Sequence, residues 1–232
     1  MAEAYTLAAQ EIVSSLKQND GKCLDCGANS GYWFEHLSQE IGLAPNRYHG
    51  IEWSSPDVEA ARQKHINVQQ GDLNNPFPFE NDTFQCIFAL SVLEHLLNGC
   101  HFLKESHRTL QPGGKLIILT PNISTYFTAA LILAGRMPSS GPHPDSNILL
   151  KSEEIFKVSS HELKWDAESE NPVHRHLVVF SFLTLRKYLN ILGYSNVKGY
   201  GFGLYPLPNF LQPLAEKIDP YHCHQMVFIA EK

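Results

Sequence analysis

The stretch LDCGANSG, residues 24–31, decides the fold of this chain. An apolar strand, expected over residues 22–25, leads into it, and an amphipathic helix, expected over residues 32–41, follows it. In open α/β sheets ligands bind just outside the carboxyl ends of the strands, where the strand order reverses. The first strand-turn-helix unit is therefore the expected ligand site.

The same alternation continues in both directions from this turn. Strands are expected over residues 22–25, 48–52, 66–70, 84–90, 115–120, 196–199 and 226–230. Helices are expected over residues 4–17, 32–41, 99–110 and 184–192, and another begins at Ser54 or Ser55 with Pro56 in its first turn. Strands that alternate with helices predict a parallel sheet covered by crossover helices, within one α/β domain of residues 1–232.

The rhythm breaks between residues 123 and 176. This segment has no clean strand pattern, although residues 123–135 are compatible with a helix, and it contains the turn-rich stretch SSGPHPDSN. We interpret residues 123–176 as an insertion or lid over the mouth of the sheet. An ordinary long connection is the alternative.

Charge and hydropathy exclude several classes of protein. Lys and Arg total 18 against 24 Asp and Glu, a net charge of -6, and no basic stripe is visible, so no nucleic-acid partner is expected. The apolar run at residues 129–134 is far shorter than the roughly 20 residues of a membrane span. The first residues lack the pattern of a signal peptide, so we expect a cytoplasmic protein.

Cysteine and histidine motifs give no metal site. Cys23 and Cys26 form a C-x-x-C in or just after a buried strand, with no second pair to complete a zinc site. His222 and His224 flank Cys223, and strand alternation would divide these three side chains between two faces. We therefore expect no bound metal.

The chemistry of the first turn favours a cationic ligand. A dinucleotide-binding turn needs G-x-G-x-x-G, whereas this turn has only Gly27 and Gly31, with Asn29 between them. It begins with Asp25, whose charge opposes a pyrophosphate and suits an ammonium or a sulfonium.

LDCGANSG resembles the acid-x-G-x-G-x-G turn of class I S-adenosylmethionine-dependent methyltransferases, with Asn29 in place of the middle glycine. Asparagine tolerates positive φ better than most residues, so the turn can keep its shape. HGIEWS, QQGDL, NDTFQCIFALSVLEHL and LQPGGKLIILTPN resemble later motifs of the family in the same order. The resemblance implies a Rossmann-like three-layer sandwich with a seven-stranded, mostly parallel sheet whose last strand is antiparallel.

It also implies the cofactor, S-adenosylmethionine, and the site that holds it. Glu52, 21 residues after Gly31, would accept the ribose hydroxyls, and Asp72 would accept from the adenine amino group. The predicted cofactor residues are Asp25, Gly27, Asn29, Gly31, Glu52, Trp53, Asp72, Leu73 and Leu90. Taken singly, these residues have alternatives: a helix cap for Asp25, a surface acid for Glu52, a turn former for Asp72 and an edge aromatic for Trp53.

The acceptor is less well defined. Family members that act on amide or adenine nitrogens often carry an Asn- or Asp-Pro-Pro-aromatic run after the fourth strand, where this chain has residues 89–92, ALSV. We therefore expect methylation of a small-molecule or saccharide-like acceptor at oxygen, with carbon as the second choice. A nicotinamide-dependent oxidoreductase and a catalytically silent cofactor-binding protein are the alternatives.

Candidate bases lie in the segments over the strand ends. His143, His174 and His176 are the predicted catalytic residues, since an unperturbed histidine titrates near pH 6.5; local hydrogen-bonding roles are the alternative. Glu94-His95 is interpreted as pocket lining or a helix cap. The aromatic and proline-rich residues 200–214 suit an apolar substrate pocket, a packed loop or a dimer contact, and the oligomeric state is left open.

Overall fold

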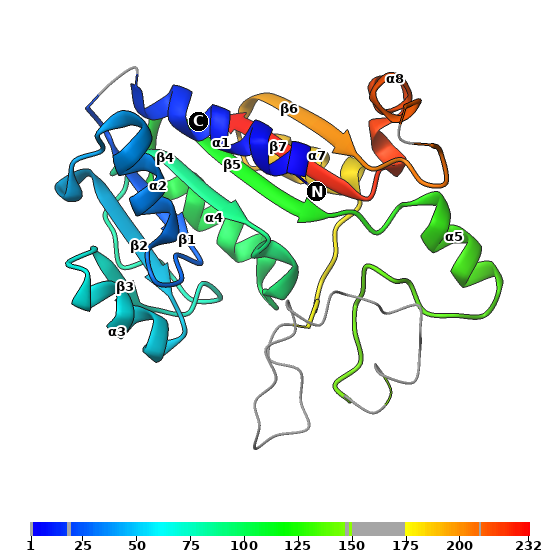
Figure 1. The fold of residues 1–232 in the computed structure, drawn as a ribbon, viewed down its shortest axis with the longest axis horizontal. Helices are drawn as coiled ribbons and strands as arrows, with labels where there is room; N and C mark the ends of the chain where they lie inside the picture. Colours follow the sequence, from blue (N-terminus) through cyan, green and yellow to red (C-terminus); the bar gives the residue numbers. More distant parts are fainter. Residues whose placement is uncertain (1, 18–19, 147–148, 150–174, 209) are drawn as a thin grey trace.

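The computed structural model describes residues 2–17, 20–146, 149, 175–208 and 210–232, and its centre is one twisted sheet (Figure 1). Seven strands lie in the order β3-β2-β1-β4-β5-β7-β6. They are β1 Lys22–Cys26, β2 Tyr48–Glu52, β3 Val68–Gln70, β4 Phe84–Leu90, β5 Leu110–Pro121, β6 Ser195–Phe202 and β7 Gln225–Glu231.

Strand direction follows the prediction. β1 pairs in parallel with both β2 and β4, and β4 pairs in parallel with β5. β7 runs antiparallel to its neighbours β5 and β6. The order reverses between β2-β1 and β1-β4, which places the turn after β1 at the topological switch point.

Helices cover both faces of the sheet, which gives the predicted three layers (Figure 1). The helices are α1 Ala2–Lys17, α2 Tyr32–Ile41, α3 Ser55–Gln63, α4 Gly99–Thr109, α5 Tyr126–Leu133, α7 Phe182–Ile191 and α8 Gln212–Ile218. Short 3₁₀ turns lie at η1 Pro45–Arg47, η2 Leu93–His95 and η4 Pro220–His222. Buried side chains of α1, α2 and α3 pack on one face, and those of α4 and α7 on the other.

Two strands differ in length from the prediction. β5 begins at Leu110, because its pairing with β4 contains a bulge that accommodates the Pro-Gly-Gly residues 112–114. β3 begins only at Val68, because the N–H of Ile66 donates to the carbonyl of Ala61 and so belongs to the end of α3.

Two less regular segments also contain helices. α5 occupies part of the stretch 123–135, and Thr125 caps it by accepting the N–H of Thr128. β6 ends at Phe202 and α8 begins at Gln212, so most of the aromatic and proline-rich stretch 200–214 connects these two elements. Within the described part of the chain, no helix combines the length and hydrophobicity needed to cross a bilayer.

Candidate functional site

The turn after β1 is held in a conformation that glycine and asparagine permit. Gly27, Asn29 and Gly31 have φ angles of 82°, 50° and 88°. The N–H groups of Gly27 and Ala28 both donate to the carbonyl of Ile51 on β2. Asn29 thus takes up the left-handed conformation that the sequence analysis required of it.

Both glycines are also closely covered by side chains. A Cβ on Gly27 would lie 2.6 Å from Cγ2 of Val92, and a Cβ on Gly31 would collide with Cδ1 of Ile66. The residues after β4 therefore pack directly on the turn. This contact links the predicted cofactor loop to the segment that begins with Val92.

Glu52, at the end of β2, braces the tip of the turn. Its Oε2 accepts the N–H of Asn29 at 2.9 Å, and its Oε1 accepts the N–H of Ser54 at 2.9 Å. The side chain is buried, with 6% of the residue exposed. Each carboxylate oxygen has a further lone pair, so the same group can still accept a ribose hydroxyl.

A hollow of about 650 Å³ opens beside this turn, within the usual size range of small-ligand sites. Its lining comes from α1, the turn, α2 and the end of β4: Tyr5, Thr6, Ala9, Gly27, Ala28, Asn29, Ser30, Tyr32, Trp33, His36 and Leu90. Of the predicted cofactor residues, Gly27, Asn29 and Leu90 are among them. The contribution of α1 was not predicted, and Tyr5 is fixed there by a 2.9 Å hydrogen bond with Ser91.

Asp25 lies beneath the turn and does not line the hollow. Its carboxylate accepts the hydroxyl of Tyr48 at 2.6 Å. The pKa of Asp25 is raised from 3.8 to about 7, chiefly by burial. The hydrogen bond from Tyr48 opposes this rise, and the charge of Glu52 adds to it. Asp25 therefore joins β1 to β2 under the turn.

The remaining predicted cofactor residues lie at the ends of β2 and β3. Trp53 is exposed, and Leu73 is buried in the core. Asp72 is exposed, and its Oδ1 accepts the backbone N–H of Asn74 at 2.9 Å. Asp72 thus shapes its own turn while remaining open to solvent.

Two of the predicted histidines meet at one point. The N–H of His143 donates to the carbonyl of His176 at 2.8 Å, and the N–H of His176 donates to Nδ1 of His143 at 3.2 Å. Nε2 of His143 donates to the carbonyl of Ser139, so both ring nitrogens of His143 are hydrogen-bonded to backbone groups. The predicted His174 lies outside the described residues.

His176 faces a second imidazole from a different element. Its ring lies 5.2 Å from that of His95 in η2, between centroids. Nδ1 of His176 contacts the carbonyl of Ser140 at 2.5 Å, and Nδ1 of His95 contacts the carbonyl of Arg175 at 3.1 Å. A carbonyl only accepts, so both Nδ1 atoms carry the proton and both Nε2 atoms carry a lone pair.

Glu94 completes this group. It is buried, and its Oε2 accepts the hydroxyl of Thr120, near the end of β5, at 2.9 Å. One ligand-type atom from each of Glu94, His95 and His176 lies within 4.8 Å of the other two. Burial lowers the pKa of His176 to about 3, so its imidazole is neutral at physiological pH. We call these three side chains the Glu-His-His cluster.

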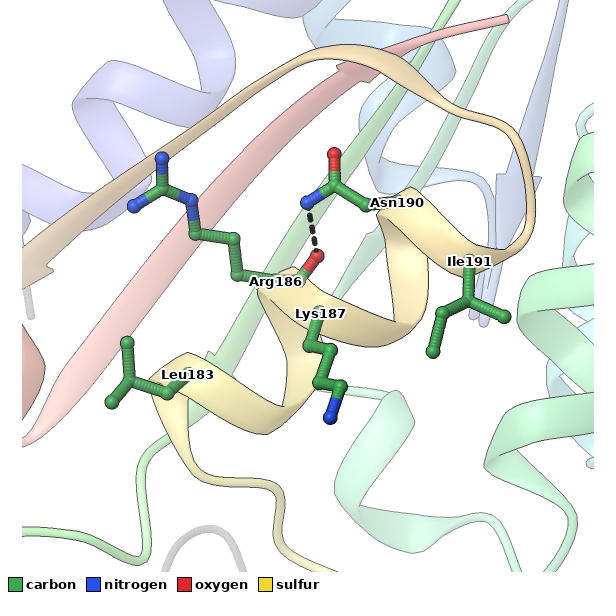
Figure 2. A pocket seen from close by; sticks show the side chains of 5 residues that line it. All are labelled: Leu183, Arg186, Lys187, Asn190 and Ile191. Carbon is green, nitrogen blue, oxygen red and sulfur yellow. Dashed lines mark hydrogen bonds between the residues drawn. The ribbon is translucent and has the colours of Figure 1, made fainter.

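A second hollow lies on the exposed side of α7 (Figure 2). Five residues of this one helix line it: Leu183, Arg186, Lys187, Asn190 and Ile191. Their side chains diverge, and the only contact drawn is the side-chain amide of Asn190 donating to the Arg186 carbonyl. Divergent side chains of a single helix do not form a binding site.

Known proteins are similar to this chain in sequence and in fold. The family model described as "Methyltransferase domain" matches residues 1–198. A demethylmenaquinone methyltransferase of Staphylococcus epidermidis is 25% identical over 151 residues, which are 58% of this chain and 62% of that protein. A ubiquinone/menaquinone biosynthesis C-methyltransferase of Geotalea daltonii is 30% identical over 132 residues, 47% of this chain and 56% of that protein. The chain thus matches less than two thirds of either relative.

The fold comparison agrees. A putative sarcosine dimethylglycine methyltransferase of Galdieria sulphuraria superposes with a TM-score of 0.61 at 12% identity, over 98% of this chain and 84% of that one. A likeness at this identity shows the fold alone, whereas the family model covers most of the sequence. With the glycine turn at the switch point and the acid of β2 bonded to its tip, the chain belongs to the class I methyltransferases, and S-adenosylmethionine is its cofactor.

Proposed function

We propose that the chain transfers the methyl group of S-adenosylmethionine to a hydroxyl of a small-molecule or saccharide-like acceptor. The observation that carries this proposal is the Glu-His-His cluster beyond the end of β4. Glu94 lies two residues after Val92, whose side chain packs on Gly27 of the glycine turn. The cluster is thus next to the expected position of the methyl donor.

The cofactor pose follows from the turn. Gly27 and Gly31 would face the methionine part, Glu52 the ribose and Asp72 the adenine. The hollow beside Asn29 and the brace from Glu52 support this placement. Trp53, Leu73 and Leu90 would then lie along the nucleoside.

The transfer itself needs little from the protein. A lone pair on the acceptor oxygen attacks the methyl carbon, the carbon–sulfur bond breaks, and sulfur keeps the electron pair in S-adenosylhomocysteine. Alignment and exclusion of water supply most of the acceleration. The hydroxyl proton must also leave, and the side chains near the acceptor decide how.

Of the predicted bases, His176 is the one whose orientation supports this role. His143 uses both ring nitrogens on backbone groups. Nε2 of His176 carries a lone pair, but the lowered pKa makes this imidazole a weak base. Loss of the proton is therefore easiest if a further positive charge near the acceptor oxygen makes the hydroxyl more acidic.

We also propose that residues 123–176 act as a lid over the acceptor. The support is the closed base of the segment: Gly141 and His143 on one side meet His176 on the other. The lid joins the core beside His95, because the N–H of Leu177 donates to the carbonyl of Glu94 at 2.7 Å. A lid anchored at the cluster would enclose the acceptor during transfer.

Methylation at a ring carbon is the second candidate. The relative from Staphylococcus epidermidis is a demethylmenaquinone methyltransferase, and the one from Geotalea daltonii is a ubiquinone/menaquinone biosynthesis C-methyltransferase. A phenol-type acceptor serves both candidates, because loss of its proton activates the oxygen and the neighbouring ring carbons alike. The two outcomes differ only in the atom that attacks.

The test is a panel of catechols, quinols and hydroxylated sugars, incubated with methyl-labelled S-adenosylmethionine. Mass spectrometry detects methylated products, and ¹³C NMR of the labelled carbon separates O-methyl from C-methyl. We expect an O-methyl product from at least one hydroxylated class. A C-methyl product selects the second candidate, and a chain that binds the cofactor but methylates no class contradicts both.

A further inference from the structure

We propose that Glu94, His95 and His176 bind a divalent first-row transition-metal ion, which holds the oxygen of the methyl acceptor. The donors are two imidazole nitrogens and one carboxylate oxygen, within 4.8 Å of one another. Two histidines and one carboxylate suit Zn²⁺, Fe²⁺ or Mn²⁺ and leave coordination positions open. The role of the ion rests on the proposed function, whereas the binding of the ion does not.

The orientation of the rings is the first argument. Nδ1–H of His95 donates to the carbonyl of Arg175, and Nδ1–H of His176 donates to the carbonyl of Ser140. A histidine that ligates a metal through Nε2 almost always donates its other N–H in this way, which fixes the tautomer and the ring plane. These two hydrogen bonds are the outer contacts that a metal site with two Nε2 ligands requires.

The carboxylate is supported in the same manner. Oε2 of Glu94 accepts the hydroxyl of Thr120, a buried residue of β5. Glu94 is itself buried, and a charged carboxylate in such a place needs a positive partner or several hydrogen bonds. A dication bound by Glu94 would place a positive charge directly beside this carboxylate.

The spacing permits closure around an ion. Zinc–nitrogen bonds of about 2.0–2.1 Å give tetrahedral ligand–ligand edges of about 3.3 Å. Each donor pair within 4.8 Å then has at most roughly 1.5 Å to close, which a small side-chain rotation achieves. His95 lies in the segment after β4 and His176 directly precedes Leu177, whose N–H donates to the carbonyl of Glu94, so the three donors are already held close together by backbone contacts.

The ion would act directly on the hydroxyl of the acceptor. A hydroxyl bound to a divalent cation has a strongly lowered pKa, so its proton passes to solvent before methyl transfer. The bound alkoxide or phenolate is then the nucleophile, and His176 serves as a ligand. Two open coordination positions would favour acceptors with adjacent oxygens, such as catechols or vicinal diols.

The binding test uses tag-free protein stripped with a chelator, without cofactor or acceptor. Calorimetry with Zn²⁺ and absorption spectra with Co²⁺ report stoichiometry, affinity and ligand set. We expect one ion per chain in the wild type and at least a roughly tenfold loss of affinity in His95→Gln, His176→Gln and Glu94→Gln, tested separately. Thermal unfolding identifies the variants that retain the fold.

His222→Gln is the matched control, because Asp219 and His222 form a close carboxylate–imidazole pair, at 2.8 Å, outside the cluster. This variant should bind the ion as the wild type does. Absence of saturable one-to-one binding in the wild type overturns the proposal, as do folded cluster variants that bind normally. A chain that methylates its acceptor equally well after chelation contradicts the role of the ion and leaves the proposed transfer intact.

Discussion

The hydroxyl of Tyr48 on β2 donates to the buried carboxylate of Asp25 on β1, with the two oxygens 2.6 Å apart. The contact crosses the parallel pair of strands just below the glycine turn. It stabilises the β1–β2 pair that supports the glycine turn. Because Asp25 is buried, the stability of this pair of strands depends on the protonation state of its carboxyl.

Asp25→Asn should increase stability more at high pH than at low pH. The folded-state pKa of Asp25 is raised from 3.8 to about 7, chiefly by burial. Between these values the folded chain binds a proton that the unfolded chain has lost, so this group's contribution to the free energy of unfolding falls as pH rises from about 4 to about 7. Asparagine removes that loss and can still accept from Tyr48.

Urea titrations of wild type and Asp25→Asn at pH 5, 6, 7 and 8 measure this effect. The difference in free energy of unfolding should grow in favour of the variant up to about pH 7 and then level off. The pair at pH 5 serves as the reference. A difference that is independent of pH would mean that Asp25 is ionised throughout, and the assigned pKa would be wrong.

Glu52→Ala should weaken S-adenosylmethionine binding by about tenfold or more. Hydrogen bonds to a charged acceptor contribute roughly 1.5–3 kcal/mol each, and the variant also loses the 2.9 Å brace to the N–H of Asn29. Titration calorimetry gives the affinity. Glu59→Ala on α3 is the control, since its carboxylate pairs with Arg62 at the surface. Unchanged affinity in a folded Glu52→Ala variant would place the ribose elsewhere.

Gly27→Ala should destabilise the protein more than Gly42→Ala. Both glycines have positive φ, 82° and 63°, which costs alanine about 1–2 kcal/mol. Only Gly27 is also crowded, with its Cβ position 2.6 Å from Cγ2 of Val92, and overpacking adds about 1–3 kcal/mol. Urea unfolding compares the two variants.

Val92→Ala in the Gly27→Ala background should restore part of the lost stability, because it removes the methyl group that collides. The same truncation in the Gly42→Ala background should restore nothing. Equal losses for the two glycine variants would show that crowding at Gly27 is relieved by a shift of the segment after β4.

Much of the fold could be predicted because strong local signals coincide with its elements. Residues 32–41, 48–52 and 84–90 have the bounds that their periodicity and flanking turn residues predicted. The start of β5 could not be predicted, since Pro112 and two glycines indicate a turn, whereas a bulge keeps them in the strand. A bulge depends on the partner strand, and the sequence of one strand does not reveal it.

The site could be predicted only where its residues are adjacent in the sequence. The turn at residues 27–31 and the acid at the end of β2 follow from motifs, whereas the hydrogen bond from the N–H of Asn29 to Glu52 was not predicted. The place of Tyr5 and Ala9 in the hollow could not be predicted, because a helix that lines a pocket and one that packs on a core share the same periodicity. Glu94-His95 acquires its third member only when the chain returns at His176, which no local spacing indicates.

The last prediction separates cofactor binding from methyl transfer. His174→Gln combined with His176→Gln removes imidazoles of the lid while keeping similar size and hydrogen-bonding capacity. The hollow proposed to hold the cofactor is lined by α1, α2, the β1 turn and Leu90, so the affinity for S-adenosylmethionine should change by less than about threefold, under roughly 0.7 kcal/mol. Turnover of the acceptor should fall by about 10²-fold or more, because loss of His176 removes a ligand of the proposed ion and, with it, the assistance to removal of the hydroxyl proton. Calorimetry and product formation measure the two quantities on the same preparation, so each controls for the other. If the double variant turns over its acceptor at the wild-type rate, these histidines only shape the lid, and catalysis rests on the alignment of acceptor, methyl group and sulfonium.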